Sequence, residues 1–275
     1  MKLIYKPEYL DGANQHLTQE VESLREETKL SEMERLKTLC TTYSRCLLIG
    51  CGIQAFQQLI GINTAMYYGP DIMEKAGITI SGMTDKESSL VLNIPLSAFN
   101  ATGTILSIFF IDRLGRRYII LRSLPFIAVS WIVTAIGMAY TGPDRSESTQ
   151  TTGGIVACIG VSCFLLFFSF GMSSTPWTIN AEIYPLHVIG TANSLSATTN
   201  WVVNAFVSEC FKLLTEISIT SEVIVYVCLG GFAVLCFFFT YYLIPETANK
   251  PIDQILEEIL GKDYQAKEQE RMRRN

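Results

Sequence analysis

The chain has 275 residues, a formal net charge of -5 and a hydrophobic content of 49%. Its charges avoid the middle of the chain: residues 1–45 carry 15 and residues 246–275 carry 13, which leaves 19 for the 200 residues between them. A soluble domain spreads charge over its whole surface. The pattern therefore excludes an ordinary soluble domain, a disordered chain and a nucleic-acid-binding surface. It predicts an all-α protein embedded in a lipid bilayer.

Residues 1–44 are predicted to form a cytoplasmic, amphipathic helical segment. Apolar residues recur at three- and six-residue steps between residues 18 and 38, which is typical of a helix with one apolar face. Ser31 and Glu34 have the spacing of a capping box, in which two side chains satisfy free backbone N–H groups at a helix start. We expect a solvated helix here.

Six later stretches are long and apolar enough to cross a bilayer, which takes about 20 residues in a helix. One such stretch could be a buried helix of a soluble protein, but six in series with charges confined between them indicate membrane spans. We expect a six-helix transmembrane bundle over residues 45–244 and a cytoplasmic tail over residues 245–275. The six stretches are residues 45–68, 89–111, 118–140, 154–175, 188–210 and 222–244.

Lys and Arg residues gather on one side of this predicted bundle. Seventeen fall in the N-terminal segment, the 112–122 loop and the C-terminal tail, and four fall on the other side. Because loops rich in Lys and Arg face the cytoplasm, both termini are predicted to be cytoplasmic. We expect the protein to be located in the plasma membrane.

Carboxamide side chains are concentrated inside the spans, where polar groups are costly. An amide both donates and accepts hydrogen bonds, as a hydroxyl does, so a row of amides suits a neutral polyhydroxyl ligand. Any single one could instead tie two helices together, but four within ten residues favour a ligand site. We expect these amides to border a cavity. They are Gln54, Gln57, Gln58 and Asn63 in the first span, Asn100 in the second, and Asn193, Asn200 and Asn204 in the fifth.

Glycine and proline interrupt two of the spans. The first is broken at Gly61 and the fourth around Gly171 and at Pro176. These are the first helices of two successive three-helix groups. Broken helices at corresponding positions of two repeats indicate a transporter binding site near the middle of the membrane.

The sequence lacks the residues that other kinds of functional site require. The chain has no acidic pair, catalytic triad, phosphate loop, selectivity filter or voltage-sensing arginine repeat, so we expect neither an enzyme nor a channel. Eight Cys residues without a C-x-x-C pair and only two His residues predict no metal site. No cofactor is expected.

Four motifs in series resemble the sugar porter family of the major facilitator superfamily. They are QQLIGIN at residues 57–63, DRLGRR at 112–117, PWTINAEIYP at 176–185 and PET at 245–247. Together they span nearly the whole chain and resemble the second half of a twelve-span transporter. The resemblance implies six transmembrane helices that form one half of the fold, as two inverted three-helix repeats.

The resemblance also implies roles for individual residues. It implies a substrate-binding set of Gln57, Gln58, Asn63, Asn100, Trp177 and Asn200. It implies a second set of cytoplasmic charges that control the outward-facing state by holding helix ends together. This charge set is Asp112, Arg113, Arg116, Arg117, Glu182 and Glu246.

The implied function is transport of a neutral polyol or sugar by alternating access. The amino-acid sequence of residues 176–185 and 190–204 is similar to that of proton-linked myo-inositol transporters. Ser169, Ser173 and Ser174 depart from the pattern of glucose carriers, and Ala248-Asn249 departs from the usual Lys-Gly. Proton coupling stays open, because its residues would lie in the other half.

The family's twelve-span architecture leads us to expect that this chain is a fragment whose partner is an absent N-terminal six-helix half. The expected partners are thus that half, the lipid bilayer, a polyol or sugar and, where transport is coupled, protons. Two alternatives stay open: half of a facilitative hexose carrier, and a non-transporting membrane protein that regulates or pairs with a full carrier.

Overall fold

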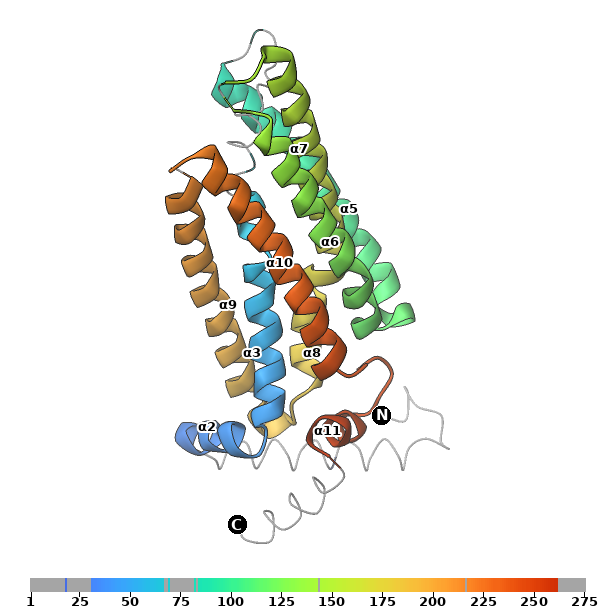
Figure 1. Cartoon of the computed structure of the whole chain (residues 1–275). Helices are drawn as coiled ribbons and strands as arrows, with labels where there is room; N and C mark the ends of the chain where they lie inside the picture. The colour runs from blue at the N-terminus through green and yellow to red at the C-terminus, as the bar shows by residue number, and fades with distance from the viewer. Residues whose placement is uncertain are drawn as a thin grey trace.

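The computed structural model describes residues 18, 31–66, 69, 82, 84–142, 144–215 and 217–261, and these residues form helices, turns and connecting segments without a β-strand. The described part of each of the six predicted spans is helical, with interruptions in the first and the fourth, and the helices form one bundle (Figure 1). The long helices are α3 (Ser44–Leu59), α5 (Asp85–Leu114), α6 (Arg116–Ala139), α7 (Glu147–Phe168), α9 (Leu186–Thr215) and α10 (Ile219–Leu243).

The fourth span is longer than predicted and is not a simple helix. α7 continues through a π-helix, η2 (Ser169–Ser173), into the short helix α8 (Thr175–Glu182). The predicted interruption around Gly171 and Pro176 is therefore confirmed. The first span is interrupted as well, since α3 ends at Leu59 and helical backbone resumes at Ile62.

Five of the described segments are long and apolar enough to cross a membrane, judged by length and composition. They are Ser44–Met66, Asn93–Leu114, Arg116–Ala139, Glu147–Glu182 and Ile219–Leu243. The fifth predicted span, α9, is a 30-residue helix that is absent from this set. It carries the amide stripe that the sequence places at Asn193, Asn200 and Asn204, and these polar residues lower its mean hydropathy.

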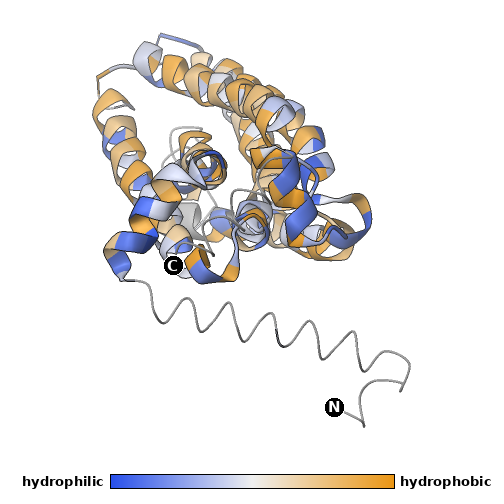
Figure 2. Ribbon diagram, turned by 90° about the horizontal axis from the view of Figure 1, so that it is seen from below, coloured by the Kyte–Doolittle hydropathy of each residue, from blue (hydrophilic) through white to orange (hydrophobic). Residues whose placement is uncertain are grey.

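Large apolar side chains cover the outside of the bundle, and hydrophobic colours dominate the long helices seen from below (Figure 2). Ile108, Phe109, Phe206 and Tyr242 are each more than 60% exposed. A surface this apolar would drive association in water, but it matches the hydrocarbon of a bilayer. Backbone polar groups meanwhile pair inside the helices, as a lipid environment requires.

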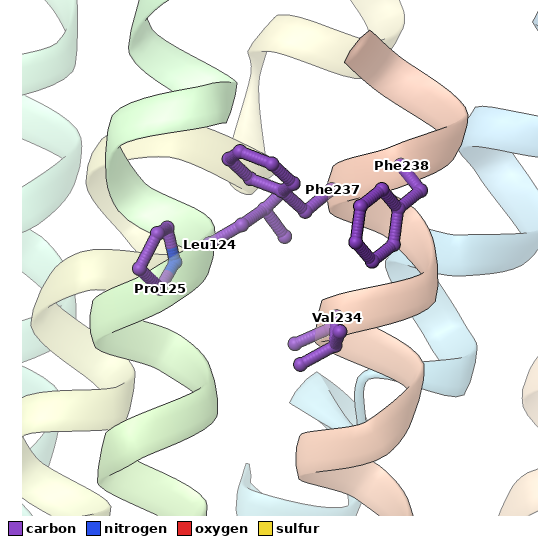
Figure 3. Close-up of a pocket in the computed structure, with 6 residues that line it drawn as sticks. Leu124, Pro125, Val234, Phe237 and Phe238 are labelled. Atoms are coloured by element: carbon purple, nitrogen blue, oxygen red, sulfur yellow. The ribbon is translucent and has the colours of Figure 1, made fainter. Parts of the chain in front are cut away.

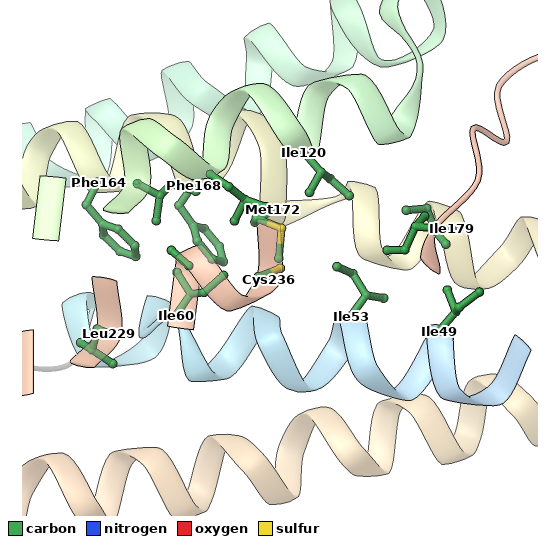
Figure 4. Packing of buried hydrophobic residues seen from close by; sticks show 14 of the residues in the cluster. Ile49, Ile53, Ile60, Ile120, Phe164, Phe168, Met172, Ile179, Leu229 and Cys236 are labelled. Carbon is green, nitrogen blue, oxygen red and sulfur yellow. The ribbon is translucent and has the colours of Figure 1, made fainter. Parts of the chain in front are cut away.

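The helix α6 packs closely on both α7 and α10, and part of the buried core lies around it. Trp131 of α6 is fully buried, with its ring centroid 4.2 Å from Phe164 of α7 and 5.5 Å from Tyr226 of α10. Phe164 and Phe168 point toward Ile60 of the first span (Figure 4). Aromatic contacts thus join three helices to the point where the first span is broken.

Two short helices lie across the same end of the bundle (Figure 1). The first is α2 (Glu32–Thr41), whose capping box between Ser31 and Glu34 is confirmed. The Ser31 backbone N–H and hydroxyl both donate to the Glu34 carboxylate, which lowers the pKa of Glu34. Leu39 of α2 is buried against the bundle, so one side of this helix is covered. Most of residues 18–30 lie outside the described residues.

The second short helix is α11 (Ile252–Leu260), inside the predicted C-terminal tail. Its residues Ile255, Leu256 and Ile259 are buried, and Arg45 at the start of α3 donates to the Ile259 carbonyl over 3.4 Å. As far as Gly261 the predicted tail is therefore docked onto the bundle. The reason is the strongly amphipathic sequence of this helix, which offers one apolar stripe to α3.

Leu256→Ala should release α11 from the bundle. The substitution removes a fully buried side chain and leaves a cavity, which costs about 2 kcal/mol or more. Limited proteolysis of the purified chain should then cut within residues 250–261 at least five-fold faster than in the unaltered chain. Asp253→Ala, on the exposed face of the same helix, should leave the rate of cleavage unchanged. Equal rates for the two variants would contradict the docking.

Candidate functional site

The amides of α3 and α9 meet in a single hydrogen-bonded cluster. Gln58 Nε2 donates to Asn200 Oδ1 over 2.9 Å. Asn200 Nδ2 in turn donates to Gln54 Oε1 over 2.7 Å and to Gln57 Oε1 over 2.8 Å. One asparagine of α9 thus contacts three successive glutamines on one face of α3, the face that the i, i+3, i+4 spacing predicts.

Two further asparagines complete this amide cluster through Gln58. Asn204 Nδ2 donates to Gln58 Oε1 over 3.2 Å, and Asn63 Nδ2 donates to the same oxygen over 2.7 Å. Asn63 lies beyond the break in the first span, so this bond joins the two sides of the break. The amide cluster is therefore Gln54, Gln57, Gln58, Asn63, Asn200 and Asn204.

The amides of the cluster hydrogen-bond to one another, which the sequence alone did not predict. Gln54 is fully buried and Asn204, at 7% exposure, is the most exposed of the five that lie on α3 and α9. Since every amide carries both donors and acceptors, two amide-bearing helix faces can close directly on each other. Within the described part of the chain, Gln54 Nε2 is left without a hydrogen-bond partner.

Gln57 also links the first span to the break in the fourth. Its Nε2 donates to the carbonyl oxygens of Met172 and Ser173, over 2.7 and 2.8 Å. Both carbonyls belong to the π-helix η2, where the wider turn disturbs the regular ladder of backbone hydrogen bonds. The glutamine side chain thus supplies donors to backbone groups at the interruption.

The break in the first span is built around Gly61. Its φ angle of +93° lies in the left-handed region that favours glycine. A Cβ at this position would also approach Leu229 Cδ1 to 2.9 Å. The neighbouring carbonyl of Ile60 accepts a hydrogen bond of 2.8 Å from the indole Nε1–H of Trp131. A buried tryptophan of α6 therefore holds the backbone at the break.

Two predicted substrate residues are not part of the amide cluster. Asn100 on α5 is half-buried, and the Trp177 side chain on α8 is 44% exposed. Among the described residues, no hydrogen bond joins either side chain to the cluster. The cluster includes instead Gln54 and Asn204, which the sequence marks by their positions on the same helix faces as Gln57 and Asn200.

The predicted charges largely come together at the end of the bundle near α11. The Arg116 Nη2 atom lies 2.9 Å from a carboxylate oxygen of Asp112 and 2.9 Å from one of Glu182. The first contact stays within one stretch of chain, but the second joins the start of α6 to the end of α8. Arg116 is only 11% exposed, so its pairing with Glu182 is screened less than a surface ion pair.

Glu246 lies at the N-terminus of α6. Its two carboxylate oxygens accept from the backbone N–H groups of Arg116 and Arg117, over 2.8 and 3.1 Å. These N–H groups have no partner within the helix, and the helix dipole favours a negative charge there. Gly115, with a φ angle of +93°, leaves the room that the carboxylate occupies.

Arg117 and Arg113 differ in their contacts. Arg117 Nη2 donates to the Tyr241 carbonyl over 2.7 Å, and its guanidinium lies 5.6 Å from the centre of the Tyr241 ring. Arg113 is exposed and pairs with no carboxylate of the described chain. Of the six predicted charges, five are therefore joined in this network, and Arg113 is not.

A family model described as "Sugar (and other) transporter" matches residues 2–259. The chain belongs to the sugar transporter family. This family consists of multi-pass membrane transporters and not of enzymes, which confirms both the predicted family and the predicted class of protein.

The relatives in the sugar transporter family are named for different solutes. Probable inositol transporter 2 of Arabidopsis thaliana is 27% identical, over 93% of this chain and 56% of its own length. The D-xylose transporter of Levilactobacillus brevis is 26% identical, over 90% of this chain and 52% of its own length. Membrane transporter D1 of Leishmania donovani is 33% identical, over 76% of this chain and 36% of its own length. The chain spans about half the length of the curated relatives it matches.

Solved structures show the same fold. The proton:xylose symporter XylE bound to 6-bromo-6-deoxy-D-glucose aligns with a TM-score of 0.64 at 25% identity, over 90% of this chain and 49% of that one. A double-tryptophan mutant of XylE aligns with a TM-score of 0.66 at 24% identity. The chain thus has the fold of half a major facilitator protein, as predicted.

Glu246→Gln should destabilise this family member by about 1 kcal/mol, because the neutral amide loses the charge-assisted bonds to the start of α6. Thermal unfolding in detergent and hydrogen exchange of the Arg116 and Arg117 amides would measure the effect. Glu258→Gln, which affects a Lys250 pair at the surface, should change the unfolding temperature much less. Equal shifts for both variants would contradict a specific role at the helix start.

Trp131→Phe should loosen the break in the first span while leaving the aromatic packing in place. The lost indole–carbonyl bond is worth about 1 kcal/mol. Hydrogen exchange of residues 62–66 should become faster, whereas Trp201→Phe, at a 64% exposed tryptophan of α9, should leave it unchanged. Unaltered exchange in Trp131→Phe would show that the bond does not hold the break.

Proposed function

We propose that this chain supplies one six-helix half of a carrier for a neutral polyol or sugar, with myo-inositol as the favoured substrate. The observation that carries the proposal is the amide cluster between α3 and α9. It consists of neutral groups that can each donate and accept, and no carboxylate or ammonium group bonds to it among the described residues. Such a cluster of amides is suited to bind hydroxyl groups and is poorly suited to bind a charged metabolite.

A polyol can enter this cluster at small net cost. A hydroxyl replaces an amide partner by offering the same donor and acceptor, so each exchange trades one bond worth about 1 kcal/mol for another. Asn200 is central, since its side chain bonds to three glutamines. We propose that the closed cluster is the substrate-free arrangement, and that Gln57, Gln58, Asn63 and Asn200 turn toward the substrate when it binds.

Asn100 and Trp177 complete the proposed binding set from outside the closed cluster. The Trp177 indole is half-exposed and its N–H has no partner among the residues described, so it can cover a sugar ring and donate to a hydroxyl. Asn100 is half-buried, and its side-chain amide forms no hydrogen bond to the described residues. In this proposal both meet the substrate from helices other than α3 and α9.

The charge network is proposed to bias alternating access. The Arg116–Glu182 pair and the Glu246 carboxylate join α6, α8 and the segment after α10 at one end of the bundle. Contacts that exist in only one of two states shift the equilibrium toward that state. Opening of this end would require these bonds to break, so we propose that they stabilise the outward-facing state, together with Arg113 and Arg117.

The orientation and the membrane are also proposals. Both α2 and α11 lie at the end of the bundle that carries the charge network (Figure 1). The excess of Lys and Arg in the N-terminal segment, the 112–122 loop and the C-terminal tail supports a cytoplasmic position for this end, with the plasma membrane as the location. The described amide cluster holds no titratable group, and so we propose that any coupling to protons depends on residues outside it.

The choice of substrate rests on the relatives and on sequence similarity. Several relatives are named for inositol, including Myo-inositol transporter 1 of Saccharomyces cerevisiae at 29% identity. The xylose transporter among them supports a monosaccharide as the second candidate. Both candidates present neutral hydroxyls to the same amides.

Asn200→Ala should lower uptake at least ten-fold while the protein still reaches the membrane. A complete twelve-span carrier, in which this chain is joined to a second six-helix half, would be expressed in yeast cells that lack inositol uptake. Labelled myo-inositol would be supplied at two pH values, with unlabelled glucose or xylose as competitors. Thr198→Ala, at an exposed hydroxyl that bonds only to its own helix, is the matched control. Unchanged uptake in Asn200→Ala, or no uptake of any of these solutes by the unaltered protein, would refute the proposal.

A further inference from the structure

The short helix α8 is held in the bundle differently from the long helices. Leu124 of α6 and Phe237 of α10 line an apolar groove between these two helices, so apolar groups form their contact (Figure 3). α8 also has an apolar contact, because Ile179 points toward Ile49 and Ile53 of α3 (Figure 4). Beside that contact, however, α8 is tied to its neighbours by buried hydrogen bonds.

A second set of buried polar groups, the Asn180 junction, joins α8 to α3 and α9. Asn180 Nδ2 donates to the Gly50 carbonyl of α3 over 3.3 Å, and Ser196 Oγ of α9 donates to Asn180 Oδ1 over 3.0 Å. Both side chains are almost completely buried. Tyr184, just beyond α8, donates from its hydroxyl to the Cys46 carbonyl of α3 over 3.0 Å. The junction consists of Gly50, Asn180, Tyr184 and Ser196.

Gly50 leaves the room that this junction needs. A Cβ atom at position 50 would collide with Asn180 Oδ1 and with the Tyr184 hydroxyl, and it would come within 3.1 Å of Ser196 Oγ. Because Gly50 has no side chain, these three polar groups lie directly against the backbone of α3. An unpaired amide is costly in an apolar interior, so the bonds of Asn180 confine α8 to one position.

The Asn180 junction lies one helical turn from the amide cluster. Gly50 precedes Gln54 by four residues on α3, and Ser196 precedes Asn200 by four residues on α9. The same faces of the same two helices therefore carry the amide cluster and, one turn away, the bonds that hold α8.

α8 carries one residue from each of the two predicted sets. Trp177 of the substrate set lies three residues before Asn180, and Glu182 of the charge set lies two residues after it. Within the described chain, the side chains of α8 that bond to other helices are Asn180 and, through Arg116, Glu182. Glu182 fixes the end of α8 that lies in the charge network, and Asn180 fixes the turn that carries Trp177.

A further tie lies just before α8 and involves the amide cluster itself. Gln57 donates to the Met172 and Ser173 carbonyls in η2. In the proposed function Gln57 turns toward the substrate, so it gives up these bonds when the substrate binds. Among the described bonds, those of Asn180 then remain to hold α8 on α3 and α9, the two helices that carry the amide cluster.

We propose that Asn180 is a positioning residue for substrate binding. It holds α8 against α3 and α9, so that Trp177 keeps its place beside the substrate after Gln57 has turned away from η2. Asn180 does not contact the substrate, because its Nδ2 donates to two backbone carbonyls and its Oδ1 accepts from Ser196. This inference rests on the proposed function and adds to it a residue outside the predicted sets.

Hydrogen exchange of the purified chain measures whether Asn180 holds α8. Asn180→Leu has nearly the same shape but cannot form the bonds, and the apolar contact of Ile179 stays in place. We expect the amides of residues 177–182 to exchange at least five-fold faster, with no change in α10. Thr178→Val, the control, removes an α8 hydroxyl that bonds only to the Ser174 carbonyl, and it should leave the exchange unchanged. Thermal unfolding would establish that both variants are folded.

Uptake kinetics of the complete twelve-span carrier measure the effect on the substrate. Asn180→Leu should raise the KM for myo-inositol at least five-fold and change the maximal rate less than two-fold, because the Arg116–Glu182 pair stays intact. Ser196→Ala should raise the KM in the same direction. The double variant should raise it no further than Asn180→Leu alone, since the two side chains act through one bond.

The two measurements together decide between a positioning role and its alternatives. Faster exchange with an unchanged KM would overturn the positioning role, because Asn180 would then serve stability alone. A raised KM with unchanged exchange would overturn it as well, because Asn180 would then act on the substrate directly. No change in either measurement, or additive effects of Asn180→Leu and Ser196→Ala on the KM, would also contradict it.

Failure of the proposed function would give a different result. The unaltered carrier would then take up none of the polyols or sugars, and a role in substrate binding would fall with the function. Exchange in the purified chain needs no substrate, so it would still show whether Asn180 holds α8.

Discussion

The hydrogen bonds between the amides of α3 and α9 are the interaction on which the rest of this bundle depends. An amide without a partner in an apolar interior costs several kcal/mol, so Gln54, Gln57 and Gln58 cannot face lipid or a dry core alone. Asn200 supplies partners to all three. This requirement brings together two helices more than 140 residues apart, and it forces the polar faces of both toward the inside. The apolar faces are then left for the lipid.

The two helix breaks follow from the same requirement. Irregular backbone is tolerated at membrane depth only where protein groups satisfy it. Gln57 donates to the carbonyls of Met172 and Ser173, and Trp131 donates to the carbonyl of Ile60. Each interruption is thus stabilised by a side chain of a different helix. At the break in the fourth span, the donor comes from the amide cluster itself, through Gln57.

The sequence predicts the helices and their polar faces well, because hydropathy and i, i+3, i+4 spacing are local properties. It also predicts two groups of motif residues, the amides inside the spans and the charges at one end of the bundle. It does not predict that Gln58 bonds to Asn200, or that Arg116 pairs with Glu182, since partners 142 and 66 positions apart become neighbours only through the fold. The closure of the amides on one another could not be foreseen for a physical reason: the same donors and acceptors serve a substrate or another amide equally well. The docking of α11 was missed because its apolar stripe is short and follows the last span.

The contacts of the bundle fall into two kinds, and this division suggests where motion occurs. α6, α7 and α10 are held by aromatic and aliphatic packing around Trp131, which is lost outright if the helices separate. The contact of α3 with α9 includes the hydrogen bonds of the amide cluster as well, and in the proposed function a polyol replaces these without leaving a buried group unpaired. In the proposed function a ligand can therefore shift α3 against α9 at little cost, whereas it offers no hydrogen bonds that would help to separate the apolar core. In the proposed function the amide cluster, and the two breaks in the first and fourth spans, are consequently the part of the fold whose arrangement a substrate changes.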